Sequence, residues 1–278
     1  MRLFLACLLL VVYRLTAAPQ PNVIVLLADD AGWGDYSFNG NRQVATPNID
    51  AIAKGGVHFD RFFVQPVCSP TRSEFLTGRY HRRLGVYGVS TGQERMNPDE
   101  KTFADSFKAA GYVTGIFGKW HNGKKTLDQS FSNGRSVYMG GMADHTDFQV
   151  QDLKDGKLSD KRPAGEFSST VFANDAISFI QKAEKENPFF LYVSFMAPHD
   201  PRNPPKKYRE IYYKNRPPLP KNFLPEHPFQ NAPQATSGRD EGLAPWPRTK
   251  EMISDQLCEY YGLVTHLDNQ VGRILSAL

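Results

Sequence analysis

The stretch VCSPTRSEFLTGRY combines a cysteine, a proline and an arginine at a spacing that can hold an anion beside a nucleophile. Pro70 favours the first turn of a helix, with Ser69 as its N-cap and Gly78 as its C-terminal stop. Cys68 then lies just outside the helix N-terminus, where free backbone N–H groups and the helix dipole favour an anion. Arg72, one turn into the helix, adds a guanidinium suited to sulfate or phosphate oxygens. Taken alone, Cys68 also fits a buried cysteine that precedes a surface helix.

Two adjacent acids follow an apolar run near the start of the chain. The run, Asn22–Ala28, predicts a central strand of a parallel sheet that is covered on both faces, and Asp29 and Asp30 come directly after it. Open α/β sheets bind ligands at the carboxyl ends of their strands. Paired carboxylates repel unless a positive charge neutralises them, and a hard divalent cation does this. The pair therefore indicates a metal site; acids that cap a helix in a solvated loop are the alternative.

Two more buried strands are predicted, over Tyr112–Phe117 and Pro188–Phe195, and ionisable residues follow both. Lys119 and His121 come after the first and, being two apart in an extended segment, can face the same way. His199 comes after the second. In isolation, a surface lysine and a hydrogen-bonded structural histidine explain Lys119 and His121 more simply. Three strands of one sheet that each end in an ionisable cluster nevertheless predict a single site at that edge.

Four stretches together resemble the type I sulfatases, a family of the alkaline-phosphatase superfamily. They are C-x-P-x-R with L-T-G-R at 68–79, TPNID-x-I-A at 46–53, GKWH at 118–121 and PHDP at 198–201. Asn122 replaces the leucine that usually follows GKWH. The resemblance runs from about Pro21 to Leu278. It implies an α/β fold with a mixed, mainly parallel sheet sandwiched by helices.

The resemblance also implies a chemistry. In this family the residue at the position of Cys68 is oxidised by a separate, formylglycine-generating enzyme to Cα-formylglycine, whose hydrated aldehyde is the nucleophile. By the same resemblance, Asp29, Asp30 and the modified Cys68 hold a divalent cation, expected to be Ca²⁺. Arg72 and Lys119 are expected to neutralise the charge of the hydrate and of the sulfate.

The resemblance assigns proton transfer to the two histidines. His121 is expected to orient or deprotonate a hydrate hydroxyl, and His199 to contact the sulfate and protonate the leaving oxygen, although the two could exchange roles. The implied activity is hydrolysis of sulfate monoesters, with a sulfated small molecule or carbohydrate as substrate. The alternatives are a phosphodiester or phosphonate monoester hydrolase with a similar site, and a remnant that folds or binds anions without turnover.

The first 18 residues have the pattern of a secretory signal: Arg2, an apolar run and small residues before the expected cleavage. The apolar run is too short for a membrane span. Residues 19–278 then form one sulfatase catalytic domain of a secreted or periplasmic protein. The family continues beyond the last helix with a strand that ends in an Asp-Asn or Asp-His pair, an active-site lysine and a smaller domain. The chain is therefore expected to be an N-terminal part, with its C-terminal part missing and little activity by itself.

Charge and cysteine content exclude two other classes. The chain has 33 Lys and Arg against 29 Asp and Glu, a net charge of +4, and its basic residues are dispersed, so no nucleic-acid surface is indicated. Cys7 lies in the predicted signal and Cys68 in the candidate site, which leaves Cys258 alone. The sequence therefore predicts no disulfide framework.

The remaining segments carry structural expectations only. An extended piece is predicted over Val57–Val64, and a surface loop rich in proline over Arg202–Arg248. His145 and Asp147 are expected to be exposed, with contacts to the substrate as the alternative. A long helix over Glu251–Leu278 closes the chain, and His266 on it is not expected to be a ligand.

Overall fold

A seven-stranded sheet forms the centre of the computed structural model, which describes residues 20–184, 187–226, 228 and 242–278. The strand order is β1-β7-β2-β3-β4-β5, and β6 pairs with β4. Parallel neighbours at one side are β1 (Val23–Asp29), β7 (Phe189–Pro198), β2 (Val113–Lys119) and β3 (Asn133–Tyr138). Antiparallel pairing adds β4 (Gln149–Lys154), β5 (Lys157–Leu158) and β6 (Arg162–Pro163). The mixed, mainly parallel sheet that the sequence predicts is confirmed.

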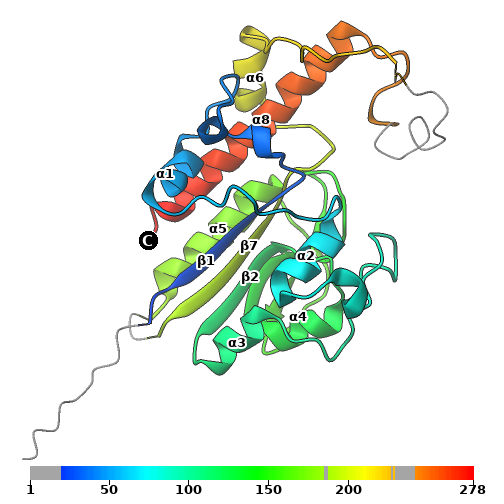
Figure 1. Ribbon diagram of the computed structural model, residues 1–278. Helices are drawn as coiled ribbons and strands as arrows, with labels where there is room; N and C mark the ends of the chain where they lie inside the picture. Colours follow the sequence, from blue (N-terminus) through cyan, green and yellow to red (C-terminus); the bar gives the residue numbers. More distant parts are fainter. Residues whose placement is uncertain (1–19, 185–186, 227, 229–241) are drawn as a thin grey trace, which may run out of the picture.

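Helices cover both faces of this sheet (Figure 1). In chain order they are α1 (Pro47–Gly55), α2 (Cys68–Thr77), α3 (Phe103–Ala109), α4 (Lys124–Ser130), α5 (Ser168–Lys182), α6 (Lys206–Lys214) and α8 (Lys250–Leu275). Helix α8 packs against α1, α5, α6 and β7. Its Asp268 accepts hydrogen bonds from the backbone N–H groups of Asn48 at 3.0 Å and Ile49 at 2.9 Å, and thereby anchors the first turn of α1.

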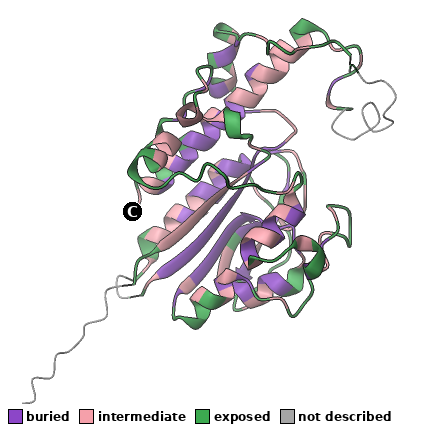
Figure 2. Ribbon diagram, viewed as in Figure 1, coloured by how far each residue is buried: buried purple, intermediate pink, exposed green. Residues whose placement is uncertain are grey.

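Strand β7 is buried along its whole length (Figure 2). Its side chains divide between two hydrophobic cores. Leu191 and Val193 belong to the core shared with α5 and α8. Phe190 and Tyr192 belong to the core shared with α2, α3 and α4. This alternation is what a strand covered on both faces requires, because successive side chains point to opposite faces.

Two predicted segments differ from the structure. The loop expected over Arg202–Arg248 contains helix α6, whose Tyr208 and Tyr212 are buried at helical spacing between proline-rich flanks that obscured the pattern. The piece predicted as extended over Val57–Val64 pairs with no strand among the described residues. The predicted signal, residues 1–18, lies outside the described residues. In the part of the chain that is described, no helix combines the length and apolarity needed to cross a membrane.

Candidate active site

Helix α2 begins at Cys68 itself, with Val67 as N-cap, and ends at Thr77, followed by Gly78 as C-cap in the left-handed conformation with φ 67°. The predicted stop at Gly78 is confirmed, whereas the prediction of Ser69 as N-cap is wrong. The Ser69 hydroxyl instead donates a hydrogen bond of 2.8 Å to the carbonyl oxygen of His121. Cys68 therefore lies in the first turn, where backbone N–H groups have no carbonyl partner within the helix. The Ser69 contact ties this turn to the segment that follows β2.

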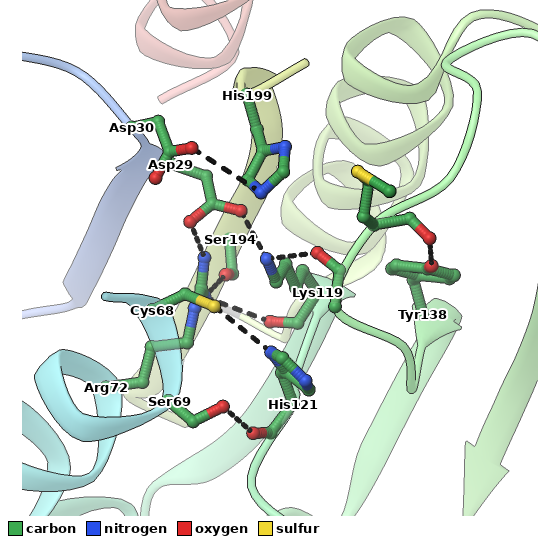
Figure 3. Close-up of polar contacts among 12 residues, drawn as sticks. Asp29, Asp30, Cys68, Ser69, Arg72, Lys119, His121, Tyr138, Ser194 and His199 are labelled. Atoms are coloured by element: carbon green, nitrogen blue, oxygen red, sulfur yellow. Dashed lines mark hydrogen bonds and ion pairs between the residues drawn. The ribbon is translucent and has the colours of Figure 1, made fainter. Parts of the chain in front are cut away.

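The side chain of Cys68 faces an uncharged imidazole. Its Sγ lies 3.2 Å from Nδ1 of His121 (Figure 3). Burial, assisted by the positive charges of Lys119 and Arg72, lowers the pKa of His121 to about 4. A neutral imidazole accepts a proton at one nitrogen, and Nδ1 is the nitrogen that faces residue 68. His121 thus has the place and the charge of a general base for a nucleophile at position 68.

Two buried cations share the carboxylate of Asp29 (Figure 3). Lys119 Nζ lies 2.5 Å from Oδ2, and Arg72 Nη2 lies 3.2 Å from Oδ1. Burial acts to raise the pKa of Asp29, but the charges of Arg72 and Lys119 outweigh it and hold this pKa below its usual value. Arg72 also donates to Oγ of Ser194 in β7, and Lys119 to the carbonyl oxygen of Gly141. Two cations around one carboxylate leave positive charge for an incoming anion.

One nitrogen of this cluster lacks an acceptor. Nε of Arg72 is buried and has no hydrogen-bond partner among the described residues, and the whole side chain is only 2 % exposed. A buried N–H group without an acceptor costs free energy, so such groups mark places where a ligand oxygen or a water completes the structure. The guanidinium is therefore suited to an additional oxygen beside Cys68.

Asp30 faces away from these cations and toward His199 (Figure 3). Its Oδ2 lies 3.4 Å from Nε2 of His199. His199 Nδ1 donates to the carbonyl oxygen of Asp200 at 2.8 Å, so Nε2 is the nitrogen left for the site. Burial raises the pKa of Asp30. Ligand atoms of Asp30, His199 and Asp200 lie within 4.8 Å of one another, and two carboxylates with one imidazole fit a divalent cation.

All seven predicted site residues gather at one edge of the sheet. Parallel pairing brings the carboxyl ends of β1, β7 and β2 together there, and α2 points its first turn at the same place. The seven are Asp29, Asp30, Cys68, Arg72, Lys119, His121 and His199. Their separate roles as metal ligands and catalytic groups stay predictions.

Four further residues of this edge were missed. Asp200, Gly141 and Ser194 contact the predicted residues, and only Ser194 had a signal, as a polar residue inside an apolar strand. Asn122, where the sulfatase pattern has leucine, is fully buried, and its amide donates to the carbonyl oxygens of Ser69 at 3.1 Å and Glu94 at 3.3 Å.

Two other histidines lie behind the site. The prediction that His145 is exposed is wrong, because its side chain is fully buried. His266 is also buried, and its Nε2 lies 3.2 Å from Oγ1 of Thr170 between α8 and α5. Neither histidine belongs to the cluster of carboxylate and imidazole groups around Asp30.

A family model of sulfatases matches residues 21–278. The chain belongs to the sulfatase family. The arylsulfatase of Klebsiella aerogenes is 29 % identical over 294 residues, which cover 93 % of this chain and 62 % of the relative. A solved structure in complex with its substrate D-glucosamine-2-N,6-O-disulfate has a TM-score of 0.73 and 22 % identity, covering 93 % of this chain and 62 % of that one. The phosphonate monoester hydrolase of Agrobacterium radiobacter has a TM-score of 0.68 and 22 % identity, covering 93 % and 59 %.

The family and the fold expected from the motifs are thus confirmed. The match extends over nearly all described elements of this sulfatase-family chain, from the start of β1 to the end of α8. The chain spans about 62 % of the length of the arylsulfatase that it matches.

Proposed function

We propose that the whole protein is a sulfuric ester hydrolase that cleaves sulfate monoesters with a nucleophile formed from Cys68. The observation that carries this proposal is the contact of 3.2 Å between Cys68 Sγ and His121 Nδ1, in a chain of the sulfatase family. A nucleophile requires a base within hydrogen-bond reach, and this pair has one at the positive end of a helix. The contact therefore supports covalent catalysis at residue 68.

Cys68 is proposed to be converted to Cα-formylglycine by a formylglycine-generating enzyme, a partner during maturation. The hydrated aldehyde supplies one hydroxyl that attacks sulfur in line and a second whose deprotonation expels sulfate and restores the aldehyde. In this structure Sγ of Cys68 stands for the oxygens of that hydrate. The first turn of α2 favours negative charge on them.

Proton transfer is assigned to two histidines on opposite sides of the nucleophile. His121 Nδ1 faces residue 68 and accepts the proton of a hydrate hydroxyl. His199 presents Nε2 from the end of β7, held in that orientation by its Nδ1 hydrogen bond, and protonates the leaving oxygen. A positioned acid or base contributes typically about 10²–10⁴-fold to the rate.

Arg72 and Lys119 are proposed to bind the sulfate. Both side chains are buried, and both are already oriented by Asp29, so that little reorganisation is needed when the anion arrives. The free Nε of Arg72 gives one donor that no described residue uses. Charge developing on the sulfate oxygens in the transition state is then met by two fixed cations.

A divalent cation is proposed at the same edge, held by Asp29, Asp30 and residue 68, with Ca²⁺ as the expected ion because carboxylate oxygens predominate. Of the groups that cluster around Asp30, the carboxylates of Asp30 and Asp200 support a cation on that side, while Nε2 of His199 is kept for proton transfer. Such an ion supplies electrostatic stabilisation of negative charge on the nucleophile and on the sulfate.

The proposed substrate is a sulfated carbohydrate or small molecule. The solved relative binds a doubly sulfated glucosamine, and a human relative that is 34 % identical over 216 residues is an N-acetylgalactosamine-6-sulfatase. The likeness to a phosphonate monoester hydrolase keeps phosphonate and phosphate esters as a second candidate class. We further propose that residues 1–18 are a secretory signal and that the protein is secreted or periplasmic.

The test uses the full-length protein, co-expressed with a formylglycine-generating enzyme. Mass spectrometry of the tryptic peptide Phe62–Arg72 is expected to show an aldehyde at position 68. An aryl sulfate is expected to be turned over with a higher kcat/KM than an aryl phosphonate or a phosphodiester, and Cys68→Ala is the inactive control. A persistent thiol would contradict the proposal, and a preference for the phosphonate would favour the second candidate class.

A further inference from the structure

The buried residue His145 is fastened to the start of helix α5. Its ring is 0 % exposed and stacks on Phe167 with centroids 5.0 Å apart. Ser168 holds it twice: the Ser168 N–H donates to the carbonyl oxygen of His145 at 2.8 Å, and the Ser168 hydroxyl lies 2.7 Å from Nδ1. Both the backbone and the ring of His145 are therefore fixed by one residue of α5.

The other ring nitrogen decides the tautomer of His145. Nε2 lies 2.9 Å from the carbonyl oxygen of His199. A carbonyl oxygen can only accept, so Nε2 carries the proton and Nδ1 accepts from the hydroxyl of Ser168. Burial lowers the pKa of His145, which keeps the ring neutral as this tautomer requires.

The hydrogen bond from His145 acts on the backbone of His199, the residue whose side chain enters the active site. Fixing that carbonyl group limits rotation of the peptide that follows His199. The same residue donates from Nδ1 to the carbonyl oxygen of Asp200 at 2.8 Å, and its Nε2 lies 3.4 Å from Asp30. Movement of the backbone at His199 would therefore move the imidazole relative to Asp30.

Asp144, the residue before His145, makes a second contact with the segment that follows His199. Asp144 Oδ2 accepts from the amide of Asn203 at 2.9 Å, and Asp144 Oδ1 accepts from the N–H of Thr146 at 2.7 Å. Residues 144 and 145 thus hold the chain at 203 and 199, on either side of Asp200. This stretch lies outside the three strands that carry the site residues, and it touches none of the reacting groups.

We propose that His145 is a positioning residue, which fixes the imidazole of His199 in the active site through the His199 carbonyl group while Ser168 holds the ring of His145 at Nδ1. Its catalytic consequence rests on the proposed sulfatase function, whereas the positioning is a property of the fold. Misplacement of a catalytic group by about 1 Å can cost about 10²-fold in rate. Loss of the donor at His145 should therefore lower kcat by about 10- to 100-fold and leave KM within about threefold.

The kinetic test compares three variants of the full-length, matured protein. His145→Leu removes the donor, and His145→Gln keeps an amide N–H near the place of Nε2. His266→Leu is the matched control, because that ring is also buried and contacts Phe167, with centroids 4.7 Å apart, but bonds to Thr170. Rates are scaled to aldehyde content and folded fraction. We expect His145→Leu to lower kcat with KM little changed, and His145→Gln to recover most of kcat. The control His266→Leu should change neither kcat nor KM.

Two kinetic results would overturn the proposal. One is a kcat of His145→Leu equal to that of His266→Leu. The other is a loss in His145→Gln as large as in His145→Leu, because the retained donor would then be irrelevant.

A measurement independent of turnover keeps the proposal testable if the variants do not fold. Long-range ¹H–¹⁵N spectra of the histidine rings in the wild-type protein should show His145 protonated at Nε2, and Ser168→Ala should increase the Nδ1–H form. An Nδ1–H tautomer in the wild type would refute the hydrogen bond to His199. If the wild type shows the expected tautomer but cleaves no sulfate ester, the proposed function fails while the positioning stands.

Discussion

The most demanding test of the site is the substitution Asp29→Asn in protein treated with a chelator. Asp29 is 4 % exposed and is the common partner of Arg72, 1 % exposed, and Lys119, 0 % exposed. The substitution keeps the shape but removes the charge that compensates two buried cations. Removing one partner of a buried ion pair typically costs about 3–5 kcal/mol. Lys119→Met should cost less, about 1–3 kcal/mol, because Asp29 then still pairs with Arg72.

Urea unfolding followed by circular dichroism measures these free energies of unfolding. Asp255→Asn is the matched control, since its ion pair with Arg216 is about 43 % exposed and screened by solvent, so that this substitution should change the free energy of unfolding little. Because the pKa of Asp29 is lowered in the folded protein, the stabilisation from its charge is fully present above the usual aspartate pKa of 3.8. It is lost as the pH falls through the lower pKa of the folded state. The difference in the free energy of unfolding between wild type and Asp29→Asn should therefore become smaller at acidic pH. Equal losses in Asp29→Asn and Asp255→Asn would refute the account of the ion cluster.

Three further predictions concern pH, packing and metal. Burial lowers the pKa of His266 to about 3, so the unfolded chain takes up a proton that the folded chain does not. Stability should fall by about 3 kcal/mol from pH 6.5 to 4, and urea unfolding of His266→Gln should show a flatter curve. In Gly141→Ala the new Cβ would lie 2.5 Å from Cε1 of His121 and displace that ring, so steady-state assays should show a kcat about 10²-fold lower. The control Gly34→Ala should match wild type, because a Cβ at Gly34 would meet no atom within 4 Å. A divalent cation at 100 times its Kd should raise the free energy of unfolding by about 2.7 kcal/mol in thermal-shift titrations, and an equal gain in Asp30→Asn would argue against the proposed site.

The location of the site at one edge of the sheet was predictable, because three apolar runs each predict a strand that is followed by ionisable residues. Each of the apolar runs before Asp29, Lys119 and His199 is a strand, and parallel strands bring their carboxyl ends together. The start of α2 was predicted two residues late. A serine before a proline is a good N-cap on local grounds, but the Ser69 hydroxyl finds the His121 carbonyl 52 residues away. The local sequence pattern around Ser69 cannot predict a contact with a residue so distant in the chain.

The residues that support the site escaped prediction for the same reason. Asn122 and His145 are polar residues in loops, which on composition alone belong at the surface. Both are buried because partners distant in sequence satisfy them: the carbonyl group of Ser69 for Asn122, and Ser168 together with the carbonyl group of His199 for His145. Their burial depends on the assembled fold, so it cannot be inferred from spacing.

The adjacent residues Asp29 and Asp30 have different electrostatic partners in the structure. The sequence predicts that the adjacent carboxylates of Asp29 and Asp30 repel each other and that one cation neutralises both. In the structure Asp30 has a positive φ of 61°, and the side chains part: the Asp29 carboxylate is 5 % exposed between Arg72 and Lys119, while that of Asp30 is 46 % exposed and faces His199. The cations of the protein thus offset much of the charge of the buried acid, and the exposed acid is the more accessible of the two proposed ligands for an ion from solution. Since the two carboxylates belong to consecutive residues, the proposed cation at Asp30 would lie close to the proposed anion site around Arg72 and Lys119, and the proposed hydrolysis of a charged ester requires both charges near the reacting group.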